Sequence, residues 1–236
     1  MSSSLTFCKL IGTPFSTFTR TIALGLHYKG IPFEQLRTPP QSDLAFQHHP
    51  FGYLPSLVIE SKSKDGKWFT LSESQAIARY IERVAPEPPL ELSDAEAGEL
   101  GVLEEKVFEM AIMIGTWLRA GFPALEGGVI KPYVKAIDED KDPASVTPSK
   151  DDQGVVNAKQ FLDKIESRMV PDAKFAFGSH PTWADFFLFP LLDDLRAIPA
   201  WEMIASEKMR EWITNMDKLE AVFKTKPGTL SAGASP

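Results

Sequence analysis

Cysteine is nearly absent from this sequence, which carries one, Cys8, in 236 residues. A single cysteine excludes a disulfide within the chain and a metal cluster built from the cysteines of one chain. Histidine is also scarce, and two of the four histidines, His48 and His49, are neighbours that point to opposite sides of an extended chain. We interpret both as loop residues. We therefore expect no metal centre, and we expect a reducing, intracellular setting.

Long hydrophobic runs are missing as well. The longest apolar run, Phe186 to Leu192, is far shorter than the roughly 20 residues that span a bilayer. The segment Met1 to Leu10 has no basic stretch leading into an apolar one. We therefore expect a soluble, cytoplasmic protein without a membrane partner. Basic residues are outnumbered, 25 against 32 acidic ones, and the resulting net charge of -7 repels phosphate backbones, so nucleic acid is not an expected partner.

The sequence changes in character near Ala85. Three prolines, Pro86, Pro88 and Pro89, remove helical hydrogen bonds there, so residues 85–95 are predicted to be a linker. Before this linker, strand and helix signals alternate over residues 1–84 in the order β-α-β, then β-β-α. The predicted elements are strands in Leu5 to Ile11, from Ile31, in Leu54 to Ile59 and in Trp68 to Leu71, and helices over Thr17 to Tyr28 and Ser74 to Val84.

Helical periodicity replaces the strand signals after the linker. Apolar residues recur every three or four positions from Leu100 to Leu118, from Val155 to Met169 and from Met209 to Phe223. This spacing predicts a helical bundle over residues 96–224. Residues 225–236 lack apolar spacing and are predicted to form a flexible tail.

Four local motifs make this two-lobe pattern specific. They are Ser16-Thr17-Phe18-Thr19-Arg20, His49-Pro50-Phe51-Gly52-Tyr53-Leu54-Pro55-Ser56-Leu57, Leu71-Ser72-Glu73-Ser74-Gln75-Ala76-Ile77 and Pro181-Thr182-Trp183-Ala184-Asp185. In this order they resemble the motifs of the cytosolic glutathione S-transferase family, serine type. The resemblance implies an α/β thioredoxin-like N-terminal domain followed by an all-α helical-bundle C-terminal domain.

The resemblance also implies a set of site residues. Ser16 falls where the family places a residue that faces the glutathione sulfur, Pro55 matches a cis proline, and Glu73-Ser74 matches the segment that holds the γ-glutamyl end. The backbone of Leu54 would pair with glutathione as with an added strand, and Gln41 would contact its glycine carboxylate. The predicted electrophile pocket comprises Phe15, Met110, Met113, Ile114, Trp117 and Phe122. The family further implies a homodimer.

The residue types themselves fit this chemistry. The glutathione thiol has a pKa of about 8.5, so a hydroxyl donor and a helix N-terminus at Ser16 would raise the fraction of thiolate. The alternative is that Ser16 only caps a helix, although a capping box would need Glu or Gln where the chain has Thr19. Thr13, Ser4 and Tyr53 are lesser candidates for the same donor.

Two further motifs have structural alternatives. Ser74 could receive a carboxylate at a helix start while Glu73 accepts from an ammonium group, but the same pair could also be a plain helix cap. Thr182 and Asp185 have the spacing of a reciprocal capping box, so we interpret them as a folding device and not as catalytic groups.

The predicted function is a glutathione transferase that stabilises the glutathione thiolate and transfers it to small hydrophobic electrophiles, in detoxification. Because Ser16 is not cysteine, reactions through a mixed disulfide are not expected, and Cys8 is interpreted as a core side chain. Two alternatives stay open at this stage. The site could serve a glutathione-dependent peroxidase, acting on a hydroperoxide, or a lyase, or the fold could belong to a catalytically silent interaction or regulatory protein.

Overall fold

The computed structural model describes residues 7–60, 68–93, 95, 115, 118–139, 141–142 and 148–233. The chain divides into two compact units. The first consists of Met1–Glu91 together with Leu219–Pro227, and the second of Leu92–Lys218 together with Gly228–Pro236. The predicted domains place residues 219–224 in the helical domain, whereas the structure groups them with the first unit.

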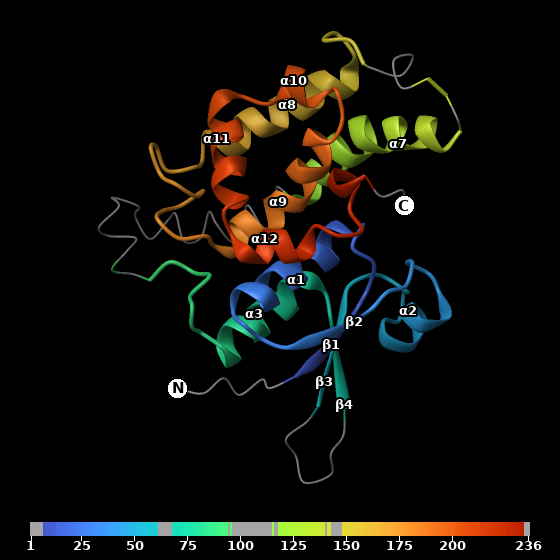
Figure 1. Ribbon diagram of the computed structural model, residues 1–236, viewed down its shortest axis with the longest axis vertical. Helices are drawn as coiled ribbons and strands as arrows, with labels where there is room; N and C mark the ends of the chain where they lie inside the picture. The colour runs from blue at the N-terminus through green and yellow to red at the C-terminus, as the bar shows by residue number, and fades with distance from the viewer. Residues whose placement is uncertain are drawn as a thin grey trace. The chain divides into compact units, whose positions relative to one another are not determined.

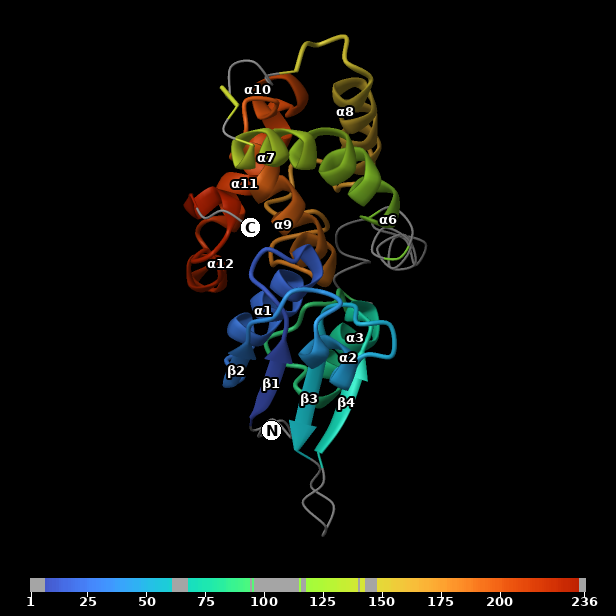
Figure 2. The ribbon, with the colours of Figure 1, turned by 90° about the vertical axis from the view of Figure 1, so that its right-hand side faces the viewer.

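The first unit is built on a four-stranded mixed sheet with the order β2-β1-β3-β4. Strand β1 runs parallel to β2 and antiparallel to β3, which is antiparallel to β4 (Figure 2). The elements are β1 (Cys8–Ile11), α1 (Thr17–Tyr28), β2 (Phe33–Leu36), α2 (Asp43–His48), β3 (Ser56–Glu60), β4 (Trp68–Ser72) and α3 (Ser74–Val84). This arrangement confirms the thioredoxin-like lobe that the sequence predicts.

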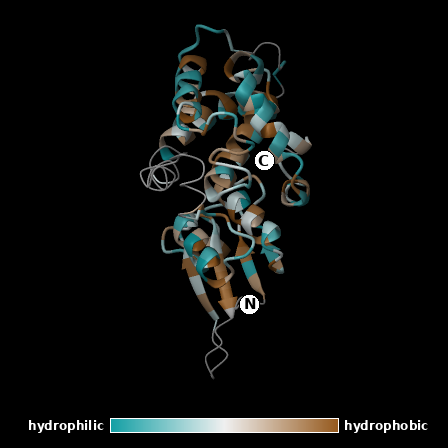
Figure 3. Ribbon diagram, turned by 90° about the vertical axis from the view of Figure 1, so that its left-hand side faces the viewer, coloured by the Kyte–Doolittle hydropathy of each residue, from teal (hydrophilic) through white to brown (hydrophobic). Residues whose placement is uncertain are grey.

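Helices cover both faces of this sheet. Figure 1 shows α1 and α3 on one side and α2 on the other. The side chains of Leu10, Ile22, Leu57, Ile77 and Ile81 are fully buried, and they come from β1, β3, α1 and α3. Figure 3 shows the apolar colour along the strands and the polar colour on the outer turns of the helices. The core therefore lies between the sheet and the α1–α3 pair.

Helix α2 is absent from the sequence prediction. Ser42 is its N-cap and accepts from the backbone N–H of Ala45, and Asp43 lies in its first turn. The interpretation of His48 and His49 as loop residues was wrong, because His48 ends this helix and His49 is its C-cap and is buried. Six residues are too few to display helical periodicity, so only the Ser-Asp start was available as a signal.

Lys29 ends α1 as predicted, but it does more than favour the helix terminus. Its ammonium group is fully buried, forms an ion pair with Glu82 at 2.9 Å, and donates to the carbonyls of Ala85 and Pro88, each at 2.8 Å. The Glu87–Pro88 peptide bond is cis. The proline-rich segment is thus fastened to the end of α1 by a buried charge.

The second unit is helical, as predicted. Its elements are α6 (Leu118–Gly121), the π-helix η2 (Phe122–Ile130), α7 (Lys131–Asp138), α8 (Gln153–Glu166), α9 (Trp183–Arg196), α10 (Trp201–Ile204), α11 (Glu207–Met216) and the 3-10 helix η4 (Leu230–Ala232). Helix α9 forms its centre, since Phe186, Phe187, Leu188 and Phe189 are all buried. The predicted helix over 100–118 lies almost entirely outside the described residues.

The chain end departs from the sequence prediction. The periodicity from Met209 to Phe223 is broken, because α11 ends at Met216 and α12 (Glu220–Thr225) starts anew, packs on α1 and leaves Phe223 76% exposed. In the predicted flexible tail, Thr225 and Thr229 are buried and Ser231 donates to Asp193 at 2.5 Å. None of the helices among the described residues is both long and apolar enough to cross a membrane.

Candidate active site

The predicted glutathione-binding segments meet at one end of the sheet. In the strand register Ile11 pairs with Ser56, and Ser56 pairs with Ser72. Because these pairings are antiparallel, the residues that follow Ile11, precede Ser56 and follow Ser72 lie beyond the same end of the sheet. The turn that leads to Ser16, the Leu54–Pro55 bond and Glu73 thus share this end.

Gly12 starts the turn between β1 and α1, and its position allows only glycine. Its φ is 147°, and a Cβ added to it would lie 2.3 Å from Oγ1 of the buried Thr19. The carbonyl of Gly12 accepts from the side-chain amide of Gln35 at 2.9 Å. The turn is therefore packed tightly against the first turn of α1, which places Ser16 at the start of that helix.

Ser16 is half-buried and is the N-cap of α1, and its hydroxyl oxygen accepts from the Thr19 N–H at 3.3 Å. No described residue accepts the Ser16 hydroxyl proton, so capping leaves its O–H available as a donor. Among the lesser candidates, Thr13 accepts from the Phe15 N–H at 3.4 Å and Tyr53 is exposed, while Ser4 lies outside the described residues.

The Leu54–Pro55 peptide bond is cis, as the resemblance implies. Pro55 is buried and Leu54 is half-buried. Within the described part of the chain, neither the N–H nor the C=O of Leu54 has a hydrogen-bond partner. This residue therefore presents the backbone groups that an extended peptide needs for strand-like pairing.

Glu73 is the N-cap residue of α3, yet its side chain makes no capping hydrogen bond and is 64% exposed. Its φ of 69° lies in the left-handed region, which costs a non-glycine residue about 1 to 3 kcal/mol. Ser74 follows it as the first residue of α3 and is half-buried. The side chain of Glu73 thus remains available to a ligand, and the first N–H groups of α3 lie beside it.

His49, which the sequence motifs do not single out, lies beside the candidate site residue Glu73. The His49 ring is buried, its Nδ1 accepts from the Phe51 N–H at 3.0 Å, and its Nε2 lies 3.6 Å from a carboxylate oxygen of Glu73. The only signal in the sequence was the position of His49 at the start of the second motif.

Gln41 has a φ of 63°, and its side-chain amide donates one hydrogen bond to the Phe51 carbonyl at 2.7 Å. The second N–H of the amide is not used in that bond.

Cys8 is fully buried in β1, and this burial raises the pKa of its thiol to about 12. A thiol with such a pKa is protonated at neutral pH and is a poor nucleophile. The interpretation of Cys8 as a core side chain is confirmed. In the described ranges, no three His, Cys, Asp or Glu side chains are grouped so that they could hold a metal ion.

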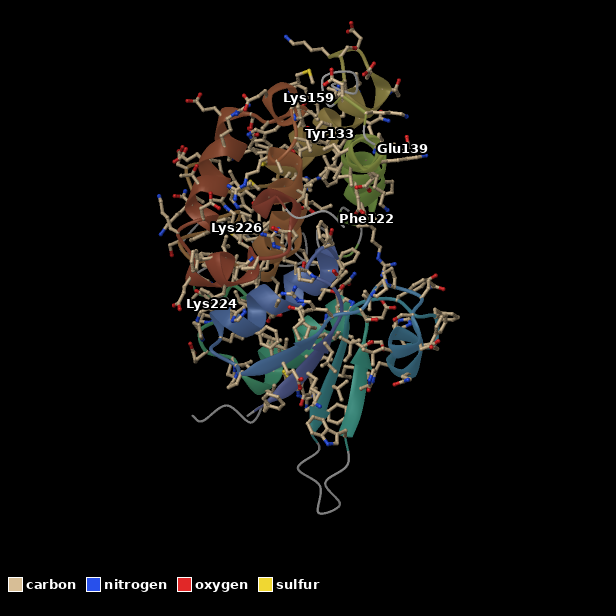
Figure 4. The ribbon with its side chains drawn as sticks, turned by 45° about the vertical axis from the view of Figure 1, so that its right-hand side comes forward. Phe122, Tyr133, Glu139, Lys159, Lys224 and Lys226 are labelled. Atoms are coloured by element: carbon tan, nitrogen blue, oxygen red, sulfur yellow. The ribbon has the colours of Figure 1, made fainter. Side chains whose placement is uncertain are left out.

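Most of the predicted electrophile pocket falls outside the described residues, including Met110, Met113, Ile114 and Trp117. Phe15 is half-buried in the turn before α1, in the first unit. Phe122 is half-buried at the start of η2, in the second unit, with the Lys131 ammonium 5.4 Å from its ring centre (Figure 4). The pocket assignment stays a prediction.

The capping box at α9 is confirmed. The side chain of Thr182 accepts from the N3 backbone N–H, and the Thr182 N–H donates to the Asp185 carboxylate at 2.8 Å. Asp185 is fully buried and also accepts from the Ala176 N–H and the Trp212 indole, each at 2.8 Å. These residues are structural and lie in the second unit.

Sequence comparisons identify the family of the two domains. A profile described as the N-terminal domain of glutathione S-transferase matches residues 10–89, and one described as the C-terminal domain matches residues 136–225. Together they span well over half of the chain. The protein belongs to the glutathione S-transferase family. No curated protein gives a significant sequence match.

Several solved structures share the fold at low sequence identity. A glutathione S-transferase from Methylobacterium radiotolerans, in complex with glutathione sulfonate, is 20% identical with a TM-score of 0.64 over 94% of this chain and 95% of that one. FzlA from C. crescentus is 19% identical with a TM-score of 0.71, covering 92% and 91%. A theta class enzyme from Xanthomonas axonopodis with glutathione bound is 15% identical with a TM-score of 0.69, covering 94% and 98%.

Proposed function

We propose that this family member is a glutathione transferase in which the Ser16 hydroxyl stabilises the thiolate of glutathione. The observation that carries the proposal is Glu73, whose exposed carboxylate sits at a strained φ and makes no capping hydrogen bond. Strained backbone at a helix start is retained where the surroundings enforce it, and such positions cluster at ligand sites. A carboxylate held there without a structural partner in the helix is suited to bind a cation.

Glutathione matches the donors and acceptors at this end of the sheet. Its γ-glutamyl ammonium would pair with Glu73, and its α-carboxylate would accept from the hydroxyl and backbone N–H of Ser74, at the positive end of α3. Its cysteinyl backbone would pair with the N–H and C=O of Leu54, and the glycine carboxylate would lie toward Gln41. Among the described residues the backbone groups of Leu54 have no hydrogen-bond partner, and Gln41 keeps one amide N–H beyond its bond to Phe51. The Glu73 carboxylate makes no capping hydrogen bond and has one oxygen 3.6 Å from the His49 ring.

The thiol would then lie near the start of α1. A hydrogen bond from Ser16 and the partial positive charge of the helix N-terminus both stabilise sulfur as an anion. Lowering the thiol pKa by two units corresponds to about 2.7 kcal/mol of preferential anion stabilisation. The thiolate attacks an electrophilic carbon of a small hydrophobic substrate and forms a C–S bond. The displaced electron pair departs with a leaving group such as halide, or stays on the substrate's own oxygen or nitrogen, which then takes up a proton. Such conjugation would serve detoxification in the cytoplasm.

The decisive binding experiment is calorimetric titration of glutathione into the parent protein and Glu73→Ala. We expect the variant to lose about 1 to 3 kcal/mol of binding free energy, because the bound ammonium loses its charged partner. Glu34→Ala is the matched control, since Glu34 is an exposed glutamate on β2 that pairs with Lys9. Equal affinity in a folded Glu73→Ala would contradict the ligand assignment.

Turnover over a panel of aryl halides, isothiocyanates, epoxides and organic hydroperoxides then decides the reaction. Conjugation of the first three classes supports the proposal. Turnover of hydroperoxides alone would favour the peroxidase alternative, and glutathione binding without any turnover would favour an interaction or regulatory protein.

We also propose that the protein is a homodimer. Three aromatic residues of the first unit, Phe46, Phe51 and Tyr53, are 48%, 65% and 57% exposed, and aromatic side chains are enriched in protein interfaces. Light scattering coupled to size exclusion should give twice the chain mass of 26.2 kDa at micromolar concentration. A mass of one chain would refute the assembly.

A further inference from the structure

We propose that His49 is a positioning residue that holds the Glu73 carboxylate for the amino group of the ligand. This inference rests on the proposed function and concerns the same site. It assigns a role to a buried histidine that the glutathione motifs leave without one. The chemical class that it selects is a γ-glutamyl compound with a free ammonium group.

The hydrogen bond that the His49 ring accepts determines which of its two nitrogens carries the proton. Nδ1 accepts from the Phe51 N–H at 3.0 Å, so Nδ1 carries no proton. In the neutral ring the proton therefore resides on Nε2. Nε2 lies 3.6 Å from one oxygen of the Glu73 carboxylate, close enough for an electrostatic contact and longer than a direct hydrogen bond. The polar N–H of the neutral ring is thus near that carboxylate oxygen.

The backbone around His49 is fastened to the strands that carry the site. The carbonyl of His48 accepts from the hydroxyls of Ser56 at 3.3 Å and of Ser72 at 3.2 Å. Ser56 and Ser72 are paired in the β3–β4 register. Ser56 directly follows Pro55, and Ser72 directly precedes Glu73. The His49 ring is 4% exposed. His49 therefore has one fixed orientation relative to both segments.

Glu73 is the side chain that needs such support. It is 64% exposed and makes no capping hydrogen bond, and the His49 ring lies 3.6 Å from its carboxylate. A ligand that must order a flexible glutamate loses affinity, and a carboxylate already oriented avoids this loss. With one oxygen directed toward His49, the other is left for an incoming ammonium group.

The test compares two ligands on three variants by calorimetry. The ligands are glutathione and glutaryl-cysteinyl-glycine, which lacks only the amino group. We expect His49→Phe to weaken glutathione binding about tenfold and to leave binding of the deamino analogue unchanged. His49→Gln should restore most of the affinity, because its amide can both accept from Phe51 and donate toward Glu73. The control is His27→Phe, the same substitution on α1, where the His27 ring lies against Phe33 of β2. It should change the affinity for neither glutathione nor the deamino analogue.

A double-mutant cycle adds a second, independent criterion. In a Glu73→Ala background, His49→Phe should have no further effect on glutathione binding, since the residue through which it acts is gone. If His49→Phe does not fold, His49→Leu replaces it in both measurements. Equal weakening of both ligands, or an undiminished effect in the Glu73→Ala background, would mean that His49 acts only on the fold and would overturn this inference. Failure of the folded parent to bind glutathione would instead overturn the proposed function, and the inference with it.

Discussion

Helices α1 and α9 begin alike, but their caps differ in hydrogen bonding. Each has a hydroxyl residue as its N-cap, Ser16 in α1 and Thr182 in α9, and each hydroxyl accepts from the backbone N–H three residues on. The Thr182 hydroxyl also donates to the Asp185 carboxylate at 2.8 Å. Three residues after Ser16 the chain has Thr19, which offers no carboxylate. The α1 cap therefore keeps a free O–H donor, whereas every group of the α9 cap has a partner.

Burial separates the two caps further. Thr182 and Asp185 are fully buried, and burial raises the pKa of Asp185 against the opposing effect of its hydrogen bonds from Ala176, Trp212 and Thr182. Ser16 is only half-buried. A saturated, buried cap stabilises the fold, while an unsaturated one that a small molecule can reach is suited to bind a ligand. The same local signature thus occurs in an unsaturated and a saturated form, and the residue at the third position after the cap decides which.

The strongest test of the α9 side of this comparison is Asp185→Ala. We expect the free energy of unfolding to fall by about 3 to 5 kcal/mol, because several buried donors lose their acceptor at once. Urea denaturation measures this loss. Asp163→Ala is the control, since Asp163 forms an exposed pair with Lys159 on α8 and should change stability by less than about 0.5 kcal/mol. A loss no larger than that of the control would break the distinction between the two caps.

The α1 side is tested by Ser16→Ala. We expect the pKa of the bound glutathione thiol to rise by part of the roughly two units, because the N-terminus of α1 still stabilises the thiolate, and turnover at neutral pH to fall by up to roughly 100-fold. Glutathione affinity should change little, because the hydroxyl stabilises the thiolate far more than the thiol. The ultraviolet absorbance of bound thiolate against pH reports the shift. An unchanged titration would move the role to Thr13 or to the backbone donors alone.

Ser16→Cys complements this experiment. It should weaken conjugation and introduce disulfide exchange with glutathionylated substrates, a reaction that the parent should lack. Exchange activity already present in the parent would contradict the serine mechanism.

The smallest effect is expected for Thr182→Ala. Losing the cap should lower the free energy of unfolding by about 1 to 2 kcal/mol, and glutathione binding and turnover should stay at the parent values. Comparing its chemical denaturation and kinetics with those of Ser16→Ala gives the sharpest contrast: one cap should affect stability alone, the other mainly chemistry. A drop in turnover for folded Thr182→Ala would show that the two caps are not separable in this way.

Local patterns were sufficient where the physical cause is itself local. The bounds of α1 and α3 and the Thr182–Asp185 box follow from caps, glycine and apolar spacing within a few residues. Helix α2 has six residues, too few to show a period, and the apolar spacing from Met209 to Phe223 continues across the break at Asp217 to Leu219, so it does not reveal that two helices meet there. Spacing predicts a face of a helix, but it does not predict what covers that face.

The sequence by itself determined the fold class, the order of the elements and the segments that carry the candidate site, since these depend on periodicity, turn residues and recognisable motifs. Only the tertiary structure decided how those segments meet. Strand pairing brings Leu54, Pro55 and Glu73 to one end of the sheet, and the docking of α2 turns His49 from an expected loop residue into a buried partner of Glu73. Likewise the Lys29 ammonium finds its carbonyl partners more than 50 residues away. Such contacts depend on packing between distant segments, and no local pattern encodes the distance between two side chains.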